Sequence, residues 1–330
     1  MVINDDSQTS SVVAGGLINP VILKRFTLAW RTKEQLALAR PFYENLERKL
    51  EVSLYSRLPV VRRFVSVEEQ NLWFEASDKN GLKEFLSADI QKNTNAYIDA
   101  LLGFGEVRQT ARVDTKQLVF AYMEYLSKKE LLLQETFDFG SFQIGENYIS
   151  YKSIKAKKIV FAEGFGMKEN QYFNYLPLNG NKGEYVFVKA PLLKEDRAIK
   201  STIFCIPEGN DIYRIGANYD RNDATNEPTD KTKKELLQKW ERIFKCPYEL
   251  VDHVAGIRPT VIDRRPLIGQ HPKHHNLYIL NGFGSRGVLI APYASKHLYQ
   301  NIEENKAIPK EMDIARFFEK SRNIHFFWYR

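Results

Sequence analysis

Residues 282–287 read Gly-Phe-Gly-Ser-Arg-Gly, which is a G-x-G-x-x-G pattern. The apolar run before it, 277–280, predicts a strand, and the periodicity from about residue 287 to 302 predicts a helix. A glycine loop between a strand and a helix is typical of dinucleotide binding. A complete βαβ unit would continue into a strand with an acidic residue, but residues 301–309 are polar and a last helix is predicted near 312–319. The loop therefore predicts a helix N-terminus that meets either a pyrophosphate or another ligand.

A second motif lies upstream, where residues 256–259 read Gly-Ile-Arg-Pro and residues 263–269 read Asp-Arg-Arg-Pro-Leu-Ile-Gly. Arg258 precedes a proline, which favours an extended conformation at the end of a strand. A guanidinium in a fixed position can bind a carboxylate through two parallel hydrogen bonds. The alternative is a structural arginine that pairs with an acidic residue of the same chain. The residues alone leave both interpretations open.

Composition restricts the class of protein. The chain has 330 residues, which suggests about two domains, and its 43% hydrophobic and 27% charged residues are typical of a globular protein with a core. Disorder, collagen and coiled coil are excluded as the main structure. Two cysteines, Cys205 and Cys246, are too few for a disulfide scaffold or a zinc cluster and indicate a reducing compartment.

Charge and hydropathy say little about partners. No window has the roughly 18 to 20 apolar residues of a membrane helix, and the first six residues lack the basic region of a secretory signal. We therefore expect a cytoplasmic protein without a membrane span. The net charge of +7 admits an anionic partner, but the basic residues are scattered, which favours a solvated basic surface.

Metal and hydrolase sites are not predicted. His271, His274 and His275 lie close together without the spacing or acidic partners of a metal site, and we interpret His274 and His275 as an exposed turn. Ser10 and Ser11 lie outside a G-x-S-x-G elbow, which argues against a hydrolase nucleophile.

Local patterns predict alternating helices and strands. A helix is expected over 32–50, with Pro41 kinking or interrupting it. A capping box of Ser66 and Glu69 predicts the start of a second helix, and Asp114 or Thr115 can cap a third. The remaining predicted elements are strands at 58–65, 131–142, 148–153 and 158–162, a meander at 184–190, 202–206 and 212–217, and a helix from 229 to about 244. Because no linker separates these elements, two interleaved domains are predicted.

The first residues have the character of a strand end. Val2 and Ile3 precede Asn4-Asp5-Asp6, which predicts a buried parallel strand that ends in a carboxylate. A hydroxyl-rich turn follows, and then the adjacent Gly15 and Gly16 suit a backbone that approaches something closely.

Together these stretches resemble the FAD-dependent amine oxidoreductases of the D-amino-acid oxidase type, which include glycine oxidase. The opening resembles the family's second strand, and residues 9–17 resemble its segment along the pyrophosphate and flavin. Residues 159–164 resemble the strand and turn under the adenine. The blocks 256–269 and 282–292 resemble the arginine strand and the C-terminal flavin loop with its helix.

The resemblance implies an α/β fold, with a Rossmann-like FAD-binding domain and an α+β substrate domain that has a mostly antiparallel sheet. It implies that the FAD domain comprises residues 1–30, 110–180 and 250–330, and the substrate domain residues 31–109 and 181–249. FAD would be the cofactor, and the substrate an amino acid or related amine that loses a hydride to flavin N5.

The resemblance also implies the site residues. Arg258 would bind the substrate carboxylate and place the α-carbon over N5, while N–H groups around Ser285 to Val288 would stabilise negative charge on the reduced flavin. Phe204 stands where glycine oxidases carry a tyrosine, and Arg286 lies in the flavin loop. The expected cofactor contacts are Asp5, Ser10, Ser11, Gly15, Gly16, Leu17, Ala162, Gly164, Gly282, Gly284, Gly287, Val288 and Leu289.

Two departures leave alternatives open. The sequence Gly-Ser-Arg-Gly at 284–287 also resembles the flavin domain of the bifunctional bacterial enzyme that modifies wobble uridine, which would imply a tRNA-linked substrate. The family also begins with a β-α unit and its own G-x-G-x-x-G, about thirty residues before the ribose acid, for which this sequence has no room. The chain as given is therefore expected to bind FAD poorly, or to be a non-catalytic remnant.

Overall fold

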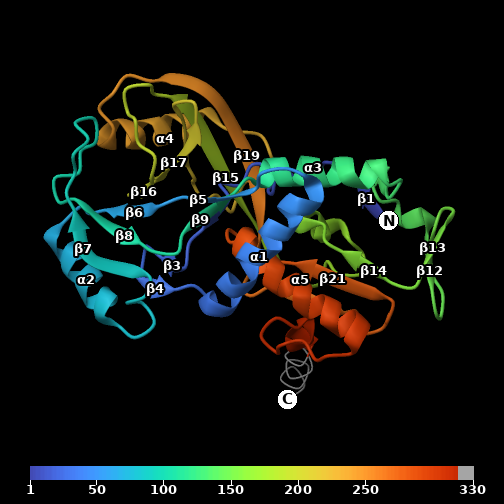
Figure 1. Cartoon of the computed structure of the whole chain (residues 1–330). Helices are drawn as coiled ribbons and strands as arrows, with labels where there is room; N and C mark the ends of the chain where they lie inside the picture. The colour runs from blue at the N-terminus through green and yellow to red at the C-terminus, as the bar shows by residue number, and fades with distance from the viewer. Residues whose placement is uncertain (319–330) are drawn as a thin grey trace, which may run out of the picture. The chain divides into compact units, whose positions relative to one another are not determined.

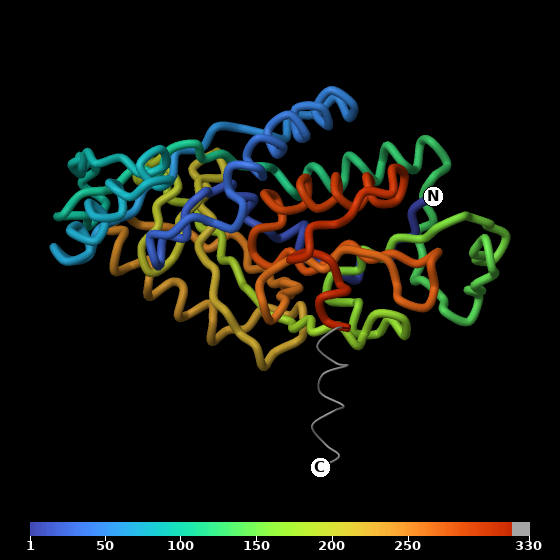
Figure 2. Tube along the Cα trace, turned by 90° about the horizontal axis from the view of Figure 1, so that it is seen from below, coloured from blue at the N-terminus to red at the C-terminus, as the bar shows by residue number. Residues whose placement is uncertain are grey.

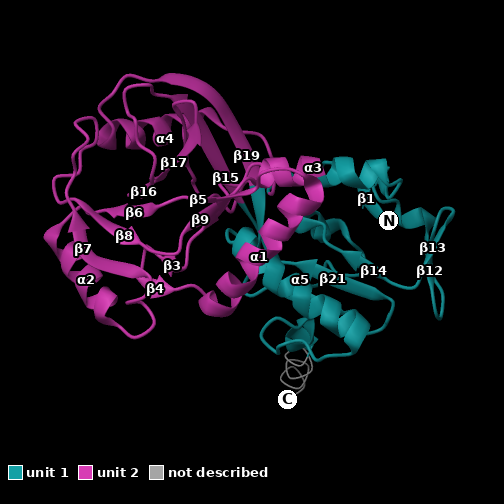
Figure 3. Cartoon of the chain, in the orientation of Figure 1, with its two compact units in different colours: residues 1–10, 122–181, 257–330 teal, residues 11–121, 182–256 magenta. Residues whose placement is uncertain are grey.

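The computed structural model describes residues 1–318, which form two compact units (Figure 3). Unit 1 comprises residues 1–10, 122–181 and those from 257 onward, and unit 2 comprises 11–121 and 182–256. Both units are therefore built from separate segments. The units group residues 11–30 and 110–121 with residues 31–109, whereas the predicted FAD domain included those two segments. Compactness does not say what each unit binds, so the functional domain assignment stays a prediction.

Unit 1 contains two sets of parallel strands. β1 (Val2–Asn4) pairs with β10 (Leu132–Gln134) in a two-stranded parallel sheet, and Figure 2 traces these distant segments side by side near the N-terminus. β14 (Ile159–Phe161) is parallel to β21 (Leu277–Asn281), which is antiparallel to β20 (Leu267–Gln270). The predicted buried strand at Val2 is thus parallel, but Val2 is exposed because β1 has one partner strand among residues 1–318.

One hydrophobic core serves unit 1. It contains Phe161, Leu277 and Ile279 from the central strands, and Ile3 and Leu133 pack against it. Helix α5 (Gly287–Glu304) contacts β20 and β21 (Figure 1). The other elements of this unit are η1 (Phe139–Ser141), β11 (Phe142–Ile144), β12 (Ile149–Tyr151), β13 (Ile154–Ala156), η2 (Gly164–Glu169) and η3 (Ile314–Phe317).

A sheet of eight strands is the main feature of unit 2, in the order β19-β15-β18-β17-β16-β6-β8-β7. The pairing is mostly antiparallel, as predicted, with a parallel pair between β16 and β6. The strands are β6 (Val60–Arg63), β7 (Leu86–Gln91), β8 (Phe104–Val107), β15 (Leu178–Lys189), β16 (Ala198–Lys200), β17 (Phe204–Gly209), β18 (Ile212–Gly216) and β19 (Glu249–Val261). Residues 178–181 of β15 and 257–261 of β19 belong to unit 1.

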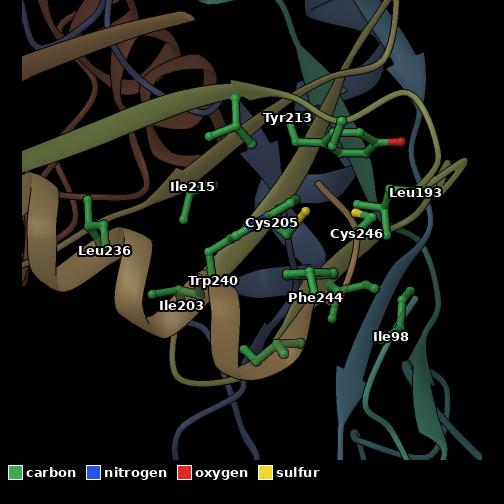
Figure 4. Packing of buried hydrophobic residues seen from close by; sticks show 14 of the residues in the cluster. Ile98, Leu193, Ile203, Cys205, Tyr213, Ile215, Leu236, Trp240, Phe244 and Cys246 are labelled. Atoms are coloured by element: carbon green, nitrogen blue, oxygen red, sulfur yellow. The ribbon is translucent and has the colours of Figure 1, made fainter. Parts of the chain in front are cut away.

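Alternating side chains give this sheet two different faces. On one face, Ile199, Cys205 and Ile215 pack with Trp240 of α4 (Asp230–Ile243) in the core of Figure 4. On the opposite face, Ile206 packs in a second core with Trp73 of α2 (Val67–Asp78). Small sheets complete the unit: β2 (Leu17–Ile18) with β9 (Ala111–Val113) and β5 (Tyr55–Arg57), and β3 (Val21–Ile22) with β4 (Thr27–Leu28).

The helix starts follow the predicted capping signals. Ser66 Oγ accepts a hydrogen bond of 3.2 Å from Glu69 N–H, and Thr229 caps α4 in the same way. The Asp114 carboxylate accepts a 2.9 Å hydrogen bond from Gln117 N–H at the start of α3 (Thr115–Lys128). These caps satisfy N–H groups that lack a partner within the helix.

Several local predictions differ from the structure. Pro41 does not interrupt α1 (Thr32–Leu50), which continues through that residue, and a kink at Pro41 stays a prediction. Residues 131–142 form the short β10, η1 and the first residue of β11 rather than one strand. Of the predicted last helix near 312–319, the described residues contain the short η3, and residue 319 lies outside them. The predicted meander also has another order, because β15 pairs with β18 rather than with β17.

Candidate functional site

The carboxyl ends of the parallel strands in unit 1 gather several of the predicted cofactor residues. Asp5 follows β1, Ala162 and Gly164 follow β14, and the glycine loop follows β21. The Gln8 side chain lies against Gly164 and Gly166, so the loops after β1 and β14 are in contact. Ligands of open parallel sheets bind outside these carboxyl ends.

Asn281 joins the loops after β14 and β21. Its side chain is buried, its amide Nδ2 donates a 2.8 Å hydrogen bond to the Gly164 carbonyl, and its Oδ1 accepts a 2.7 Å bond from Gly282 N–H. The side chain therefore holds the first residue of the glycine loop beside the turn that follows β14. Asn281 was not predicted as a site residue, and a lone asparagine at a strand end carries no distinctive sequence signal.

The glycines of the loop are present for different reasons. Gly282 has a φ of +80°, and a Cβ there would lie 2.5 Å from the Val261 side chain. The protein itself therefore requires glycine at this position. At Gly287, the nearest atom to an added Cβ is Phe283 Cβ at 3.7 Å, which is an ordinary contact. The fold thus leaves space at the first residue of α5, where a helix N-terminus favours an anionic or polar ligand.

Two carboxyl groups lie near these loops with opposite shifts in pKa. Hydrogen bonds from Ser7 lower the pKa of Asp5. Burial raises the pKa of Glu163, and the charge of Asp5 adds to that shift, although Asn170 donates a 2.7 Å hydrogen bond to the Glu163 carboxylate. Asp5 is therefore an exposed, ionised acceptor, which suits the hydroxyl groups of a ligand.

The predicted substrate arginine is connected to the glycine loop. Arg258 lies half-buried on β19, and the carbonyl of the next residue, Pro259, accepts a 2.9 Å hydrogen bond from Gly284 N–H. Unit 1 therefore brings Arg258 and the loop 282–287 together. The role of Arg258 in binding a carboxylate stays a prediction.

Residues 11–17 of the predicted segment 9–17 lie in unit 2, and the two glycines there approach the protein's own chain. A Cβ at Gly16, which has a φ of +68°, would lie 1.9 Å from the Val113 carbonyl oxygen. At Gly15 it would lie 2.9 Å from Ile206 and 3.3 Å from the Tyr185 hydroxyl. The close approach expected from these glycines is therefore internal packing, and contact with a cofactor stays a prediction for this segment.

A buried arginine holds the same segment. The Arg214 guanidinium donates to the carbonyls of Val13 (3.1 Å) and Ala14, and it pairs with Glu208 at 2.7 Å. Arg112 pairs with the other oxygen of Glu208. Sequence reasoning missed this cluster, although a charged residue alternating with apolar ones on a strand, as in Ile212–Gly216, is a usable signal for a buried ion pair.

The remaining predicted residues differ in exposure. Phe204 is half-buried on β17, and the Lys200 Nζ lies 4.8 Å from its ring centroid. Leu289 is buried in unit 1, so it could offer a ligand only its backbone. Ser11, Ala162 and Ser285 are exposed, and Ser10, Leu17, Gly164, Gly284, Arg286 and Val288 are half-buried.

Metal ligation and membrane insertion have no structural support in the described part of the chain. Residues 1–318 contain no group of three or more His, Cys, Asp or Glu side chains placed to hold a metal ion. Of the predicted exposed pair, His275 is exposed, but His274 is half-buried and stacks on His271 at 4.8 Å. Burial lowers the pKa of His271 to about 4. None of the helices in residues 1–318 is long and apolar enough to span a bilayer.

Curated relatives match part of the chain. The tRNA 5-methylaminomethyl-2-thiouridine biosynthesis bifunctional protein of Idiomarina loihiensis is 27% identical over 194 residues, and that of Legionella pneumophila strain Corby is 24% identical over 206 residues. These alignments cover 55% and 51% of this chain but 30% of each relative. The chain thus spans about a third of the length of these relatives.

Solved structures match nearly the whole chain. Glycine oxidase from Geobacillus kaustophilus has a TM-score of 0.76 and 19% identity, covering 96% of this chain and 90% of that one. Iminodiacetate oxidase from Chelativorans sp. BNC1 has a TM-score of 0.75 and 17% identity, covering 94% and 90%. At these identities the likeness concerns the fold, and it confirms the predicted α/β fold class.

The residues present fit a flavin dinucleotide. The open position at Gly287 lies at a helix N-terminus, and Asp5 offers a carboxylate at the carboxyl edge of the strands. The family described as FAD dependent oxidoreductase matches residues 3–300. The chain therefore belongs to the family of FAD-dependent oxidoreductases.

Proposed function

We propose that the protein oxidises an amino acid or a related amine that carries a carboxylate. The observation that carries this proposal is the hydrogen bond between Pro259 and Gly284, which ties the strand of Arg258 to the glycine loop at 2.9 Å. Arg258 binds the carboxylate and thereby orients the amine. FAD, when bound, accepts the hydride from the substrate carbon.

Residues of unit 1 hold the cofactor in this proposal. The N-terminus of α5 at Gly287 would hold a polar group of the flavin, and its N–H groups would favour negative charge there. The Asp5 carboxylate would accept hydrogen bonds from ribose hydroxyls. The fold neighbours named as oxidases of glycine and of iminodiacetate support an amine substrate.

The alternatives have less support. The curated relatives of tRNA modification match about half of this chain and about three tenths of their own length, so a tRNA-linked substrate is not favoured. A family match over residues 3–300 favours an enzyme over a non-catalytic remnant.

The two cysteines, both buried and free, support a cytoplasmic location.

Anaerobic reduction of the flavin tests the proposal. The protein is purified, its flavin is identified after extraction, and it is mixed in turn with glycine, iminodiacetate, other amino acids and the matching 2-hydroxy acids. We expect bleaching of the flavin absorbance with at least one amine. Bleaching by hydroxy acids alone, or a protein that takes up no FAD, would overturn the proposal.

A further inference from the structure

A groove of about 380 Å³ runs along helix α2 in unit 2, which Figure 3 shows at the margin of that unit. Its helix-side wall consists of residues seven, four and three positions apart, a spacing that places them on one face of α2: Val65, Leu72, Ala76 and Lys79. Phe26, in the turn between β3 and β4, lines the groove as well. The lining extends over the whole helix, about 18 Å, so the groove suits an elongated surface rather than a compact small molecule.

The centre of this groove is apolar and open to solvent. Leu72, in the middle of the helix-side wall, is 54% exposed, and so is Val65. Ala76 lies one turn after Leu72, is buried, and presents only a methyl group, so a large side chain of another molecule can lie beside Leu72. Large apolar side chains exposed around a groove are typical of an interaction site.

Charges of both signs surround the apolar centre. Three basic and three acidic side chains line the groove: Lys24, Arg25 and Lys79, and Glu68, Glu69 and Glu75. This balance disfavours a polyanion such as a nucleic acid, which needs mainly cations. It favours a partner whose own surface carries both signs beside an apolar centre. The same groove on a second copy of the chain is such a surface.

We propose that the groove is a contact surface between two copies of the chain, with their α2 helices antiparallel across a twofold axis at Leu72. A twofold contact requires a self-complementary surface. The position opposite Glu68 is then Ala76 of the partner subunit, because both lie four positions from Leu72, and the partner's Lys79 is one turn further on. The inference does not depend on the proposed function.

The apolar and charged residues have different tasks in this contact. The two Leu72 side chains meet at the axis and bury apolar surface, which supplies affinity. The Glu68 and Lys79 side chains are exposed in one copy. Exposed ion pairs contribute little affinity, so the two symmetric Glu68–Lys79 pairs mainly select the antiparallel direction.

Substitution at the axis tests the contact. The purified full-length chain is analysed by sedimentation over a range of concentrations, and we expect a monomer–dimer equilibrium. Leu72→Glu should raise the dissociation constant by at least about tenfold, because two carboxylates would meet at the axis. Val67→Glu is the matched control, since Val67 is 59% exposed on α2 but lies outside the groove. A wild-type chain that stays monomeric, or a dimer that survives Leu72→Glu, would overturn the proposal.

Cross-linking locates the axis. A residue on a twofold axis meets its own copy, so Leu72→Cys should form a disulfide-linked dimer with the thiol oxidant diamide. Val67→Cys should do so much more slowly, and the two native cysteines are buried. Equal cross-linking of the two variants, or none in Leu72→Cys, would contradict an axis at Leu72.

A charge exchange tests the direction of the helices. Glu68→Lys or Lys79→Glu alone should weaken dimerisation by about tenfold, because like charges replace two ion pairs, and the double variant should return to within about threefold of the wild type. Both substitutions oppose the dipole of α2, so an effect on the helix itself would add in the double variant instead of cancelling. A double variant as weak as the single ones would overturn the antiparallel contact.

Discussion

Asn281 and Gly164 are joined by a hydrogen bond of 2.8 Å from the Asn281 amide to the Gly164 carbonyl. The two residues are 117 positions apart in the sequence and lie at the carboxyl ends of the neighbouring strands β21 and β14. Because Asn281 Oδ1 also accepts from Gly282 N–H, one side chain sets the position of the glycine loop relative to the turn after β14. This contact makes the arrangement of the candidate site in unit 1 testable.

Asn281→Ala should reduce the free energy of unfolding by about 1 to 3 kcal/mol, because it leaves the buried Gly282 N–H group and the half-buried Gly164 carbonyl without this partner. Denaturant unfolding measures the change. Asn281→Asp is the matched control, since its carboxylate can still accept from Gly282 N–H but cannot donate to Gly164. If alanine and aspartate variants were both as stable as the wild type, the hydrogen bonds would not hold the loop.

Gly287→Val should abolish flavin retention while the circular dichroism spectrum stays close to that of the wild type. The protein leaves space at this position, with the nearest atom 3.7 Å from an added Cβ, so the new side chain would obstruct the ligand rather than the fold. Gly282→Ala is the contrasting variant, because a Cβ there lies 2.5 Å from Val261 and should destabilise the protein itself. If the purified Gly287→Val variant still contained stoichiometric flavin, the loop 282–287 would not approach the flavin ring.

Arg258→Lys should weaken substrate binding by about 1.5 to 3 kcal/mol, because a lysine cannot form the two parallel hydrogen bonds of a guanidinium. Steady-state kinetics on the best amino acid should show a raised KM, with the flavin content unchanged. The exposed Arg264→Lys is the control. An unaltered KM for Arg258→Lys would remove the carboxylate-binding role.

Arg214→Met should reduce the free energy of unfolding by about 1 to 3 kcal/mol, because it removes the donor to two carbonyls and leaves Glu208 with Arg112 as its cationic partner. The side chain of Arg214 is 7% exposed, so solvent screens the ion pair little. Arg40→Met removes the exposed pair with Glu44, which solvent screens, and should reduce the free energy of unfolding much less. Similar losses in the two variants would contradict a structural role for the buried cluster.

Glu163 should make stability depend on pH. Because its pKa is raised in the folded protein, the group contributes stability below its ordinary pKa of 4.5, and this contribution is lost as the pH rises through the folded pKa. Glu163→Gln keeps an acceptor for Asn170 and removes the titration. The melting temperature of the variant should therefore gain on the wild type as the pH is raised from 4 towards 8. A constant difference over this range would assign the effect to packing rather than ionisation.

The sequence alone was sufficient to predict those features whose interacting atoms are close along the chain. Ser66, Asp114 and Thr229 cap their helices within three residues, so a short pattern predicts them. The glycine loop also lies between the predicted strand and helix. These features depend on backbone conformation and on N–H groups that need a partner nearby, which residue type alone can indicate.

Tertiary structure decided the features that depend on distant strands. The Val113 carbonyl excludes any side chain at Gly16, and Arg214 reaches Val13 and Ala14 about 200 positions earlier in the sequence. The contact between the Lys200 ammonium and the Phe204 ring likewise follows from the pairing of β16 with β17. The sequence by itself determined the family and most of the helices and strands, because those follow from local patterns. Which glycine is required by packing, and which charges pair in a buried cluster, depends on strand register, and register brings together residues that no local pattern relates.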